Sequence, residues 1–337
     1  MNIMVAGGLG FIGTNFILYW FGAHGGDAIV NVDNCTYAAV WENQEDFPAG
    51  RRYFFEKADI ADYAAMDRIV KRHGIDVIVN FAAESHNSYS VVNPTAFYRT
   101  NLLGAQTLME VARNNPRVKR LHHVSTCEVY GDMPLDSGGA FTESSPLGGN
   151  SPYSSSKACG NLAAGAYFRT FGTPITVSVC SNNYGPYQFP EKLVPLFITD
   201  LMQGKPLTLY AQSGHKREWL HVADHCRAIG LIIEKGEPGE VYNIGSGVEK
   251  SIEEVADAIL GCFGKSAAEK TYIQPRPSHD RRYLLDSSKI RDALGWEPSI
   301  SFDDGIKEVA AWYADNERWW APLLGRRVVE EDWGGGA

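Results

Sequence analysis

The sequence predicts an α/β fold: a doubly wound parallel sheet covered by helices on both faces, joined to a smaller C-terminal mixed α/β lobe. Short apolar runs alternate with helix-like stretches through the first half of the chain, as in parallel strands connected by helices. After Asn183 this alternation stops, and short elements of mixed type follow. We therefore expect a first domain over residues 1–180, a second lobe interleaved with it over residues 181–330, and a flexible tail over residues 331–337.

The expected strands of the first domain are five apolar runs, each of a length that suits a buried strand. They are Ile3–Ala6, Ala28–Val32, Val77–Ala83, Leu121–Ser125 and Ile175–Val179. The stretches that carry apolar residues at helical spacing are Phe11–Phe21, Ala64–His73, Pro94–Asn114 and Tyr153–Phe171. Because strand and helix alternate several times, the strands are expected to run parallel.

The expected elements of the second lobe are shorter and less regular. They are a loop at Gly185–Pro190, a helix over Leu193–Gln203, strands at Leu207–Tyr210 and Arg217–Val222, and a helix over Ser251–Phe263. The last helix begins with Ser251 as its N-cap and has Glu254 three residues later, which is the spacing of a capping box.

Charge and hydropathy argue against several classes of protein. The 337 residues carry 31 Lys and Arg against 40 Asp and Glu, and the net charge of −9 argues against a nucleic-acid partner. No uncharged apolar run approaches the roughly 18 residues of a membrane span, and the N-terminal segment lacks the basic start of a signal peptide. The six cysteines include no CxxC pair, which favours a reduced, cytoplasmic chain without a metal site.

Three glycines, Gly7, Gly10 and Gly13, follow the first expected strand. Their spacing allows a tight turn, close approach of the backbone to a pyrophosphate, and close packing of a helix whose N-terminus faces the phosphates. An ordinary strand–helix turn is the alternative. However, Asp33 closes the next strand, where a carboxylate accepts hydrogen bonds from ribose hydroxyls and repels the 2′-phosphate of NADP. The sequence therefore predicts a Rossmann-type domain that binds NAD.

Tyr153 and Lys157 stand four residues apart at the start of an expected helix, so their side chains share one face. An ammonium beside a phenol favours the phenolate, which makes Tyr153 a candidate base for a substrate hydroxyl. A solvated helix face is the ordinary explanation of such a pair. Here, however, the segment Ser125-Thr126-Cys127-Glu128 ends an apolar strand, and ligands bind at the strand ends of doubly wound sheets.

At these residues the chain resembles the extended short-chain dehydrogenase/reductases, and within them it is similar to the dTDP-glucose 4,6-dehydratases. The similarity runs through nearly the whole chain. Its further motifs are Ala82-Ala83-Glu84-Ser85-His86, Ser181-Asn182-Asn183-Tyr184-Gly185-Pro186-Tyr187, Phe189-Pro190-Glu191-Lys192-Leu193, Arg217-Glu218-Trp219-Leu220-His221-Val222, Tyr242-Asn243-Ile244-Gly245 and Arg276-Pro277-Ser278-His279-Asp280-Arg281-Arg282-Tyr283.

The resemblance implies an NAD-dependent lyase that acts on a nucleotide-diphosphate hexose, with dTDP-glucose as the expected substrate. In that reaction Tyr153 takes the proton of the C4 hydroxyl while a hydride passes to NAD, and Thr126 hydrogen-bonds the same hydroxyl. Glu128 then removes the C5 hydrogen, the C6 hydroxyl leaves as water, and the hydride returns to C6 to give the 4-keto-6-deoxyhexose. The implied catalytic residues are Thr126, Cys127, Glu128, Tyr153 and Lys157.

The resemblance also implies the residues of the two binding sites. Cofactor contacts are expected from Gly7, Gly10, Phe11, Ile12, Gly13, Asp33, Asn34, Asp59, Ile60, Phe81, Ala82, Ala83, Thr100, Tyr153, Lys157 and Asn183. Substrate contacts are expected from Ser85, Thr126, Asn182, Lys192, Leu193, Tyr210, Arg217, Asn243, His279 and Arg281. Five of these residues keep an alternative. Asp59 could be a surface turn residue, Tyr210 a core residue, and Asn182 and Asn183 structural fillers. Arg281 could be solvated, because at most one of the adjacent Arg281 and Arg282 is expected to face the ligand.

Two departures from the family pattern matter. Cys127 stands where the family usually has the Asp that protonates the departing hydroxyl, and a thiol is a weaker acid than a carboxylic acid. Either the thiol donates slowly, or water or Glu128 serves instead, or Cys127 only fills space. Ser88 and Tyr89 stand where the family often has Asp and Arg or Asn, which affects sugar contacts. Decarboxylation of UDP-glucuronate, epimerisation and an altered dehydration therefore stay open, and so does a non-catalytic NAD-binding regulator.

A homodimer is also expected. The helices over Pro94–Asn114 and Tyr153–Phe171 are long, and relatives pair such helices across a two-fold axis into a four-helix bundle. The expected partners are thus a second copy of the chain and the nucleotide-sugar substrate.

Overall fold

The computed structural model describes residues 1–211, 213–274 and 280–326. Within these residues, seven parallel strands form one large sheet in the spatial order β10, β6, β5, β4, β1, β2, β3. The strands are β1 (Asn2–Ala6), β2 (Ala28–Asp33), β3 (Arg52–Lys57), β4 (Val77–Asn80), β5 (Arg120–Thr126), β6 (Ile175–Cys180) and β10 (Val241–Ile244). The strand order reverses between β1 and β4, the point at which doubly wound sheets hold their ligands. The predicted Rossmann-type fold is confirmed.

Helices cover both faces of this sheet because its strands present apolar side chains on both sides. On β1, Ile3 and Val5 pack with α1 (Phe11–Ala23) and α8 (Val222–Lys235). On the opposite face, Met4 and Ala6 pack with the remaining helices of this layer. These are α2 (Tyr63–His73), α5 (Ala105–Asn114) and α6 (Pro152–Phe171). The alternation of contacts along β1 is the two-residue period expected of a strand.

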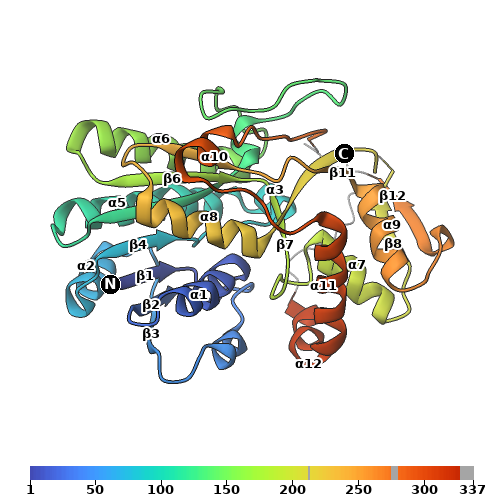
Figure 1. Cartoon of the computed structure of the whole chain (residues 1–337), viewed down its shortest axis with the longest axis horizontal. Helices are drawn as coiled ribbons and strands as arrows, with labels where there is room; N and C mark the ends of the chain where they lie inside the picture. The colour runs from blue at the N-terminus through green and yellow to red at the C-terminus, as the bar shows by residue number, and fades with distance from the viewer. Residues whose placement is uncertain (212, 275–279, 327–337) are drawn as a thin grey trace.

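The second lobe lies beside this layered domain, on the right in Figure 1. In the described residues its core gathers α7, α9, α11 and α12 around β8 and Trp219 of β9. The elements of the lobe are β7 (Asn182–Tyr184), α7 (Leu193–Met202), β8 (Leu207–Tyr210), β9 (Lys216–His221), β11 (Glu249–Ser251), α9 (Ile252–Cys262), η4 (Ala267–Glu269), β12 (Lys270–Ile273), α11 (Phe302–Asp315), α12 (Glu317–Trp320) and η5 (Ala321–Arg326). Ser251 caps α9 in a capping box with Glu254, as predicted.

The second half of the chain also completes the first sheet. β10 pairs with β6, and α10 (Ser288–Leu294) packs beside it with α8. The sequence analysis missed β10 and β3. The strand β3 lies at the sheet edge, carries Arg52, Glu56 and Lys57, and is only partly buried, so it lacks the apolar run of a central strand.

The helix predicted over Pro94–Asn114 covers these residues, but its middle segment is π-helical rather than α-helical. It consists of α4 (Pro94–Phe97), a π-helical segment η2 (Tyr98–Gly104) and α5. Within η2, Asn101 accepts from the backbone nitrogen of Glu84 at 2.9 Å and donates to its carbonyl oxygen at 3.0 Å. These two hydrogen bonds from η2 fix the position of the backbone at Glu84, in the segment that follows β4. π-Turns often occur at functional sites for this reason.

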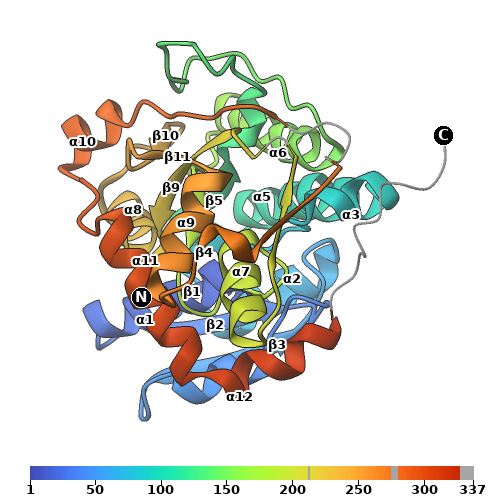
Figure 2. The ribbon, with the colours of Figure 1, turned by 90° about the vertical axis from the view of Figure 1, so that its right-hand side faces the viewer.

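The remaining segments frame the cavity described below. They are η1 (Trp41–Asp46), α3 (Asn87–Val92) and η3 (Cys127–Tyr130). Figure 2 shows the long connection from η3 to α6, in green, at the top of the molecule, with α7 and α9 in front. No helix among the described residues is both long enough and apolar enough to cross a membrane.

Candidate active site

One large cavity of about 1170 Å³ opens at the carboxyl ends of the sheet strands and continues into the second lobe. It brings together most of the predicted site residues. Those that line it are Gly7, Gly10, Phe11, Ile12, Gly13, Asp33, Asn34, Asp59, Ile60, Phe81, Ala82, Ala83, Ser85, Thr100, Thr126, Glu128, Tyr153, Lys157, Asn182, Asn183, Lys192, Leu193, Tyr210 and Arg217. The cavity therefore extends from the predicted dinucleotide site on the large sheet to the predicted nucleotide-sugar residues of the second lobe.

The turn between β1 and α1 has the shape that a dinucleotide pyrophosphate requires. Gly7 has φ +81°, and a Cβ there would lie 2.7 Å from the backbone nitrogen of Ala82. A Cβ on Gly13 would lie 2.3 Å from the carbonyl oxygen of Gly7. Gly10 caps α1 without a side-chain hydrogen bond, so no cap side chain covers the first N–H groups of the helix. These groups and the helix dipole fit the phosphates of NAD.

Asp33 is fixed at the end of β2, where an adenosine ribose would bind. Its carboxylate accepts from the backbone nitrogens of Leu9 at 3.1 Å and Cys35 at 2.8 Å. Burial raises its pKa, and these two hydrogen bonds oppose the rise. A carboxylate held in this way fits two ribose hydroxyls, so the residues present match NAD. Asp59 forms an ion pair with Arg99 at 2.7 Å on the same side of the cavity.

The catalytic candidates converge from β5, η3 and α6. Thr126 ends β5, Glu128 lies in the following turn, and Tyr153 and Lys157 lie in the first turns of α6. Burial raises the pKa of Tyr153 well above its ordinary value; the nearby Glu128 charge adds to this and the Thr126 hydroxyl opposes it. Burial lowers the pKa of Lys157 to about 8, and its Nζ donates to the Val124 carbonyl at 2.7 Å. Tyr153 is thus a neutral phenol before ligands bind.

Three of the predicted site residues that the structure describes are not part of this cavity lining. Cys127 is 1% exposed and belongs to the hydrophobic core. Asn243 is buried, where its side chain accepts from the Tyr130 hydroxyl and donates to the Phe141 carbonyl. Arg281 is turned toward Asp132, with Nε 2.6 Å from Oδ2. His279 lies outside the described residues.

Two basic residues predicted to bind the substrate, Arg217 and Lys192, have anchored side chains in the cavity. Arg217 is 6% exposed and donates to the carbonyl oxygens of Asp280 at 2.6 Å and Lys216 at 2.8 Å. Lys192 donates to the Ser85 carbonyl at 2.9 Å, which joins the two lobes across the cavity. Both cations are therefore placed near the cavity wall, where a diphosphate needs positive charge.

Sequence reasoning missed several lining residues. Glu191 is 3% exposed as a side chain and accepts from the Tyr37 hydroxyl at 3.0 Å. Burial, together with the Glu191 charge, raises the pKa of Glu84. Glu84 and Glu191 both lie inside motifs that carry the family resemblance, so the sequence did contain a signal that could have identified them. Asn87 also lines the cavity, and nothing in the local sequence pattern distinguished it.

Comparisons with known proteins agree with this geometry. The family model described as GDP-mannose 4,6 dehydratase matches residues 4–309. The dTDP-glucose 4,6-dehydratase of Streptomyces niveus is 43% identical over 327 residues, which cover 96% of this chain and 96% of that protein. The crystal structure of the Bacillus anthracis dTDP-glucose 4,6-dehydratase in complex with NAD has a TM-score of 0.89 and 43% identity, covering 96% of this chain and 99% of that one. The Streptomyces venezuelae dTDP-glucose 4,6-dehydratase, also solved with NAD, has a TM-score of 0.91 and 42% identity, with 96% and 100% covered.

Proposed function

The chain belongs to the GDP-mannose 4,6 dehydratase family of extended short-chain dehydrogenase/reductases, and from this premise we propose that it is an NAD-dependent dTDP-glucose 4,6-dehydratase. The observation that carries the proposal is the meeting of Thr126, Glu128, Tyr153 and Lys157 in one cavity with the glycine turn of α1. The reaction is a lyase step: it removes water from a nucleotide-diphosphate hexose and returns the 4-keto-6-deoxyhexose.

The roles of the residues follow from their positions. Tyr153 receives the proton of the C4 hydroxyl, which Thr126 orients from the end of β5. A phenol with a raised pKa needs nearby positive charge to ionise. Lys157, which lies four residues along the same helix and lines the same cavity, is the cation that we assign to this role. NAD, which the glycine turn of α1 and Asp33 would hold, would supply the hydride acceptor for oxidation at C4 and the hydride donor for C6. The C4 ketone makes the C5 hydrogen acidic, and Glu128 lines the cavity as the carboxylate that takes it.

Elimination also needs a proton for the departing C6 hydroxyl. Cys127 does not line the cavity. Glu128, once it has taken the C5 proton, is the acidic group that can pass a proton to the C6 oxygen, so that water leaves without a second carboxylic acid. Glu128 then performs both transfers. When the hydride returns to C6, C5 takes a proton from solvent, and Tyr153 releases to solvent the proton that it took from the C4 hydroxyl, so the protons balance.

The test is incubation with NAD and each of dTDP-glucose, UDP-glucose and UDP-glucuronate, followed by mass measurement of the products. The proposal expects loss of the mass of water from dTDP-glucose. Loss of carbon dioxide from UDP-glucuronate would indicate a decarboxylase, and an isomer of unchanged mass would indicate an epimerase. Unchanged substrate in every case would indicate a non-catalytic NAD-binding protein.

We further propose a homodimer in the cytoplasm. Large apolar side chains stay exposed along the helices expected at the two-fold axis, including Leu103 at 55%, Leu162 at 60% and Phe171 at 47%. Exposed apolar side chains favour burial against a second copy of the chain. All six cysteines are free thiols, which suits a reducing compartment.

A further inference from the structure

Asn87 connects Glu128 with the helix that carries Tyr153. It is the first residue of α3, and its Nδ2 donates to Glu128 Oε2 at 2.7 Å. Its Oδ1 accepts from Ser151 Oγ at 2.9 Å. Ser151 is the N-cap of α6. One amide therefore joins three segments that meet at the cavity, and Asn87 itself lines that cavity.

The chemistry of the two partners fixes the orientation of this amide. An ionised carboxylate only accepts hydrogen bonds, so the NH₂ group must face Glu128. The Ser151 hydroxyl accepts from the backbone nitrogen of Ser154 at 3.1 Å, which leaves its proton for the Asn87 oxygen. A reversed amide would place its oxygen against the carboxylate and its NH₂ against a donor. The backbone is held as well, since Ser90 Oγ donates to the Asn87 carbonyl at 2.6 Å.

We propose that Asn87 is a positioning residue for the elimination step: it keeps Glu128 ionised and aimed into the cavity, in register with the helix that presents Tyr153. A donor to a carboxylate favours its charged form, which is the form that accepts the C5 proton. The same bond removes rotational freedom from a long side chain, and such positioning contributes directly to rate. This inference rests on the proposed dehydratase function.

The proposal separates the two chemical steps. Asn87 donates its hydrogen bond to Glu128, the residue that removes the proton from C5. Oxidation at C4 depends instead on Tyr153 and Thr126. Weakening the Asn87–Glu128 contact should therefore slow elimination and leave C4 oxidation in place. A residue that only supports the fold would slow both steps together.

The test uses the NAD-bound enzyme with dTDP-glucose and compares wild type, Asn87→Ala and Asn87→Asp. Asn87→Asp keeps an acceptor for Ser151 but faces Glu128 with a like charge, and it has nearly the same shape as Asn. Three quantities are measured: the single-turnover rise of NADH absorbance for C4 oxidation, uptake of solvent deuterium at C5, and water loss by product mass. Asn87→Ala should lower the C5 exchange rate about tenfold, and Asn87→Asp by about a hundredfold, with NADH absorbance persisting longer in both.

The pH dependence of the C5 exchange rate is a second readout, and a change in packing alone would not shift it. In both variants the acidic limb of C5 exchange should shift to higher pH, because Glu128 has lost a donor that favours its charged form, and the shift should be larger for Asp. The matched control is Asn93→Ala at the other end of α3, whose Nδ2 donates to the Tyr89 hydroxyl at 3.1 Å. This variant should keep both rates and the wild-type pH profile.

The outcomes distinguish the inference from the proposed function. If wild type loses water from dTDP-glucose but the Asn87 variants exchange C5 at the wild-type rate, the inference is wrong and the function stands. Equal slowing of C4 oxidation and C5 exchange, with an unshifted pH profile, would show a structural role and also overturn it. If wild type converts no nucleotide sugar, the proposed function fails and this inference fails with it.

Discussion

Cys127 and Glu128 are adjacent in η3, yet Glu128 lines the cavity whereas Cys127 is buried in the hydrophobic core. Burial raises the pKa of the Cys127 thiol well above its ordinary value, and the Glu128 charge adds to the rise. A thiol placed in this way is a poor proton donor. Of the alternatives that the sequence left open, the structure favours Cys127 as a residue that fills space.

The first prediction follows from this relationship. Cys127→Ser should dehydrate dTDP-glucose at close to the wild-type rate, because the side chains are similar in size and neither serves as the acid. Cys127→Asp should be destabilised by several kcal/mol, since it buries a carboxylate in an apolar core. Product mass and urea unfolding measure the two effects. A stable Cys127→Asp protein that loses water faster than wild type would show that the position holds the acid after all.

The second prediction concerns Tyr153. Replacing it with Phe keeps the ring for packing but removes the proton acceptor, so C4 oxidation should fall about 10²–10⁴-fold. Affinity for NAD, measured by titration, should stay close to that of wild type. The matched control is Tyr167→Phe on the same helix, whose hydroxyl contacts Glu110 at 3.0 Å, away from the cavity lining. Wild-type turnover in Tyr153→Phe would show that another group takes the proton.

The third prediction tests the dimer. Leu162→Glu should lower the sedimentation mass at micromolar concentration from that of two chains to that of one, because it places a charge on the apolar face of α6. Leu135, 42% exposed in the connection between η3 and α6, provides the control, and Leu135→Glu should leave the mass unchanged. A wild-type protein with the mass of one chain would remove the dimer proposal.

The fourth prediction is a pH dependence of stability. Burial raises the pKa of Glu218 to about 7, while its Oε1 accepts from the Gly247 nitrogen at 2.6 Å and its Oε2 from the Leu285 nitrogen at 3.0 Å. Between about pH 4.5, the ordinary value, and pH 7 the folded protein holds a proton that the unfolded chain releases. The contribution of Glu218 is therefore fully present below this window and is lost as pH rises through it, by up to about 3 kcal/mol.

Urea unfolding of wild type and Glu218→Gln across this pH range measures the effect. The stability advantage of wild type over the variant should shrink as pH rises, because Gln cannot titrate. Glu317→Gln, at an exposed position, should show the same pH profile as wild type. Parallel profiles for wild type and Glu218→Gln would contradict the prediction.

The sequence was most informative where one chemical requirement set the residue type. The glycine turn of α1, Asp33, and the Tyr153 and Lys157 pair are local patterns, and the cavity contains all of them. In contrast, β10 could not be predicted from its own four residues, because they form a strand by pairing with β6, which is distant in sequence. Asn87 was missed for the same reason: its partners Glu128 and Ser151 are brought to it only by the fold.

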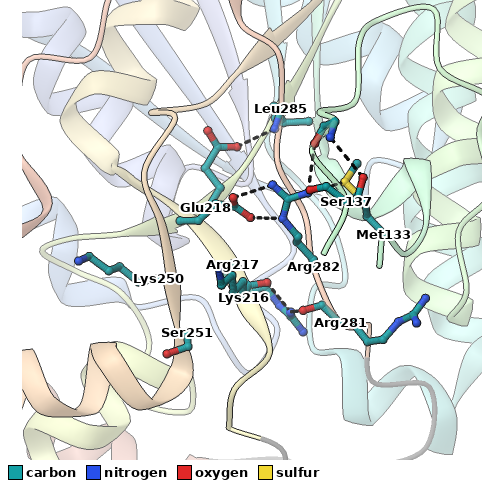
Figure 3. A network of polar contacts seen from close by, with 12 residues as sticks. Met133, Ser137, Lys216, Arg217, Glu218, Lys250, Ser251, Arg281, Arg282 and Leu285 are labelled. Carbon is teal, nitrogen blue, oxygen red and sulfur yellow. Dashed lines mark hydrogen bonds and ion pairs between the residues drawn. The ribbon is translucent and has the colours of Figure 1, made fainter. Parts of the chain in front are cut away.

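The adjacent arginines show this limit most clearly. Sequence reasoning expected at most one of them to face the ligand, and neither lines the cavity. Figure 3 shows their side chains pointing apart. Arg281 pairs with Asp132 and is 49% exposed as a side chain. The Arg282 side chain is 6% exposed. It donates two hydrogen bonds to Glu249, from Nε to Oε1 at 2.6 Å and from a terminal nitrogen to Oε2 at 2.7 Å.

The fifth prediction compares these neighbours. Arg282 also donates to the carbonyl oxygens of Ser137 at 2.8 Å and Gly139 at 3.1 Å, so it ties β11 to the connection between η3 and α6 (Figure 3). Arg282→Met should lower the free energy of unfolding by about 3–5 kcal/mol, because Glu249 and these carbonyls lose a buried partner. Arg281→Met should cost no more than about 1 kcal/mol, since its ion pair is solvated.

Equilibrium urea unfolding at neutral pH measures both values. The double variant Arg282→Met with Glu249→Gln should recover part of the loss, because it removes the charge that Arg282→Met leaves unpaired. A surface arginine would show no such recovery. If Arg282→Met and Arg281→Met lost equal stability, or if the second substitution added its own full loss, the Arg282–Glu249 pair would not be the contact that holds this connection against β11.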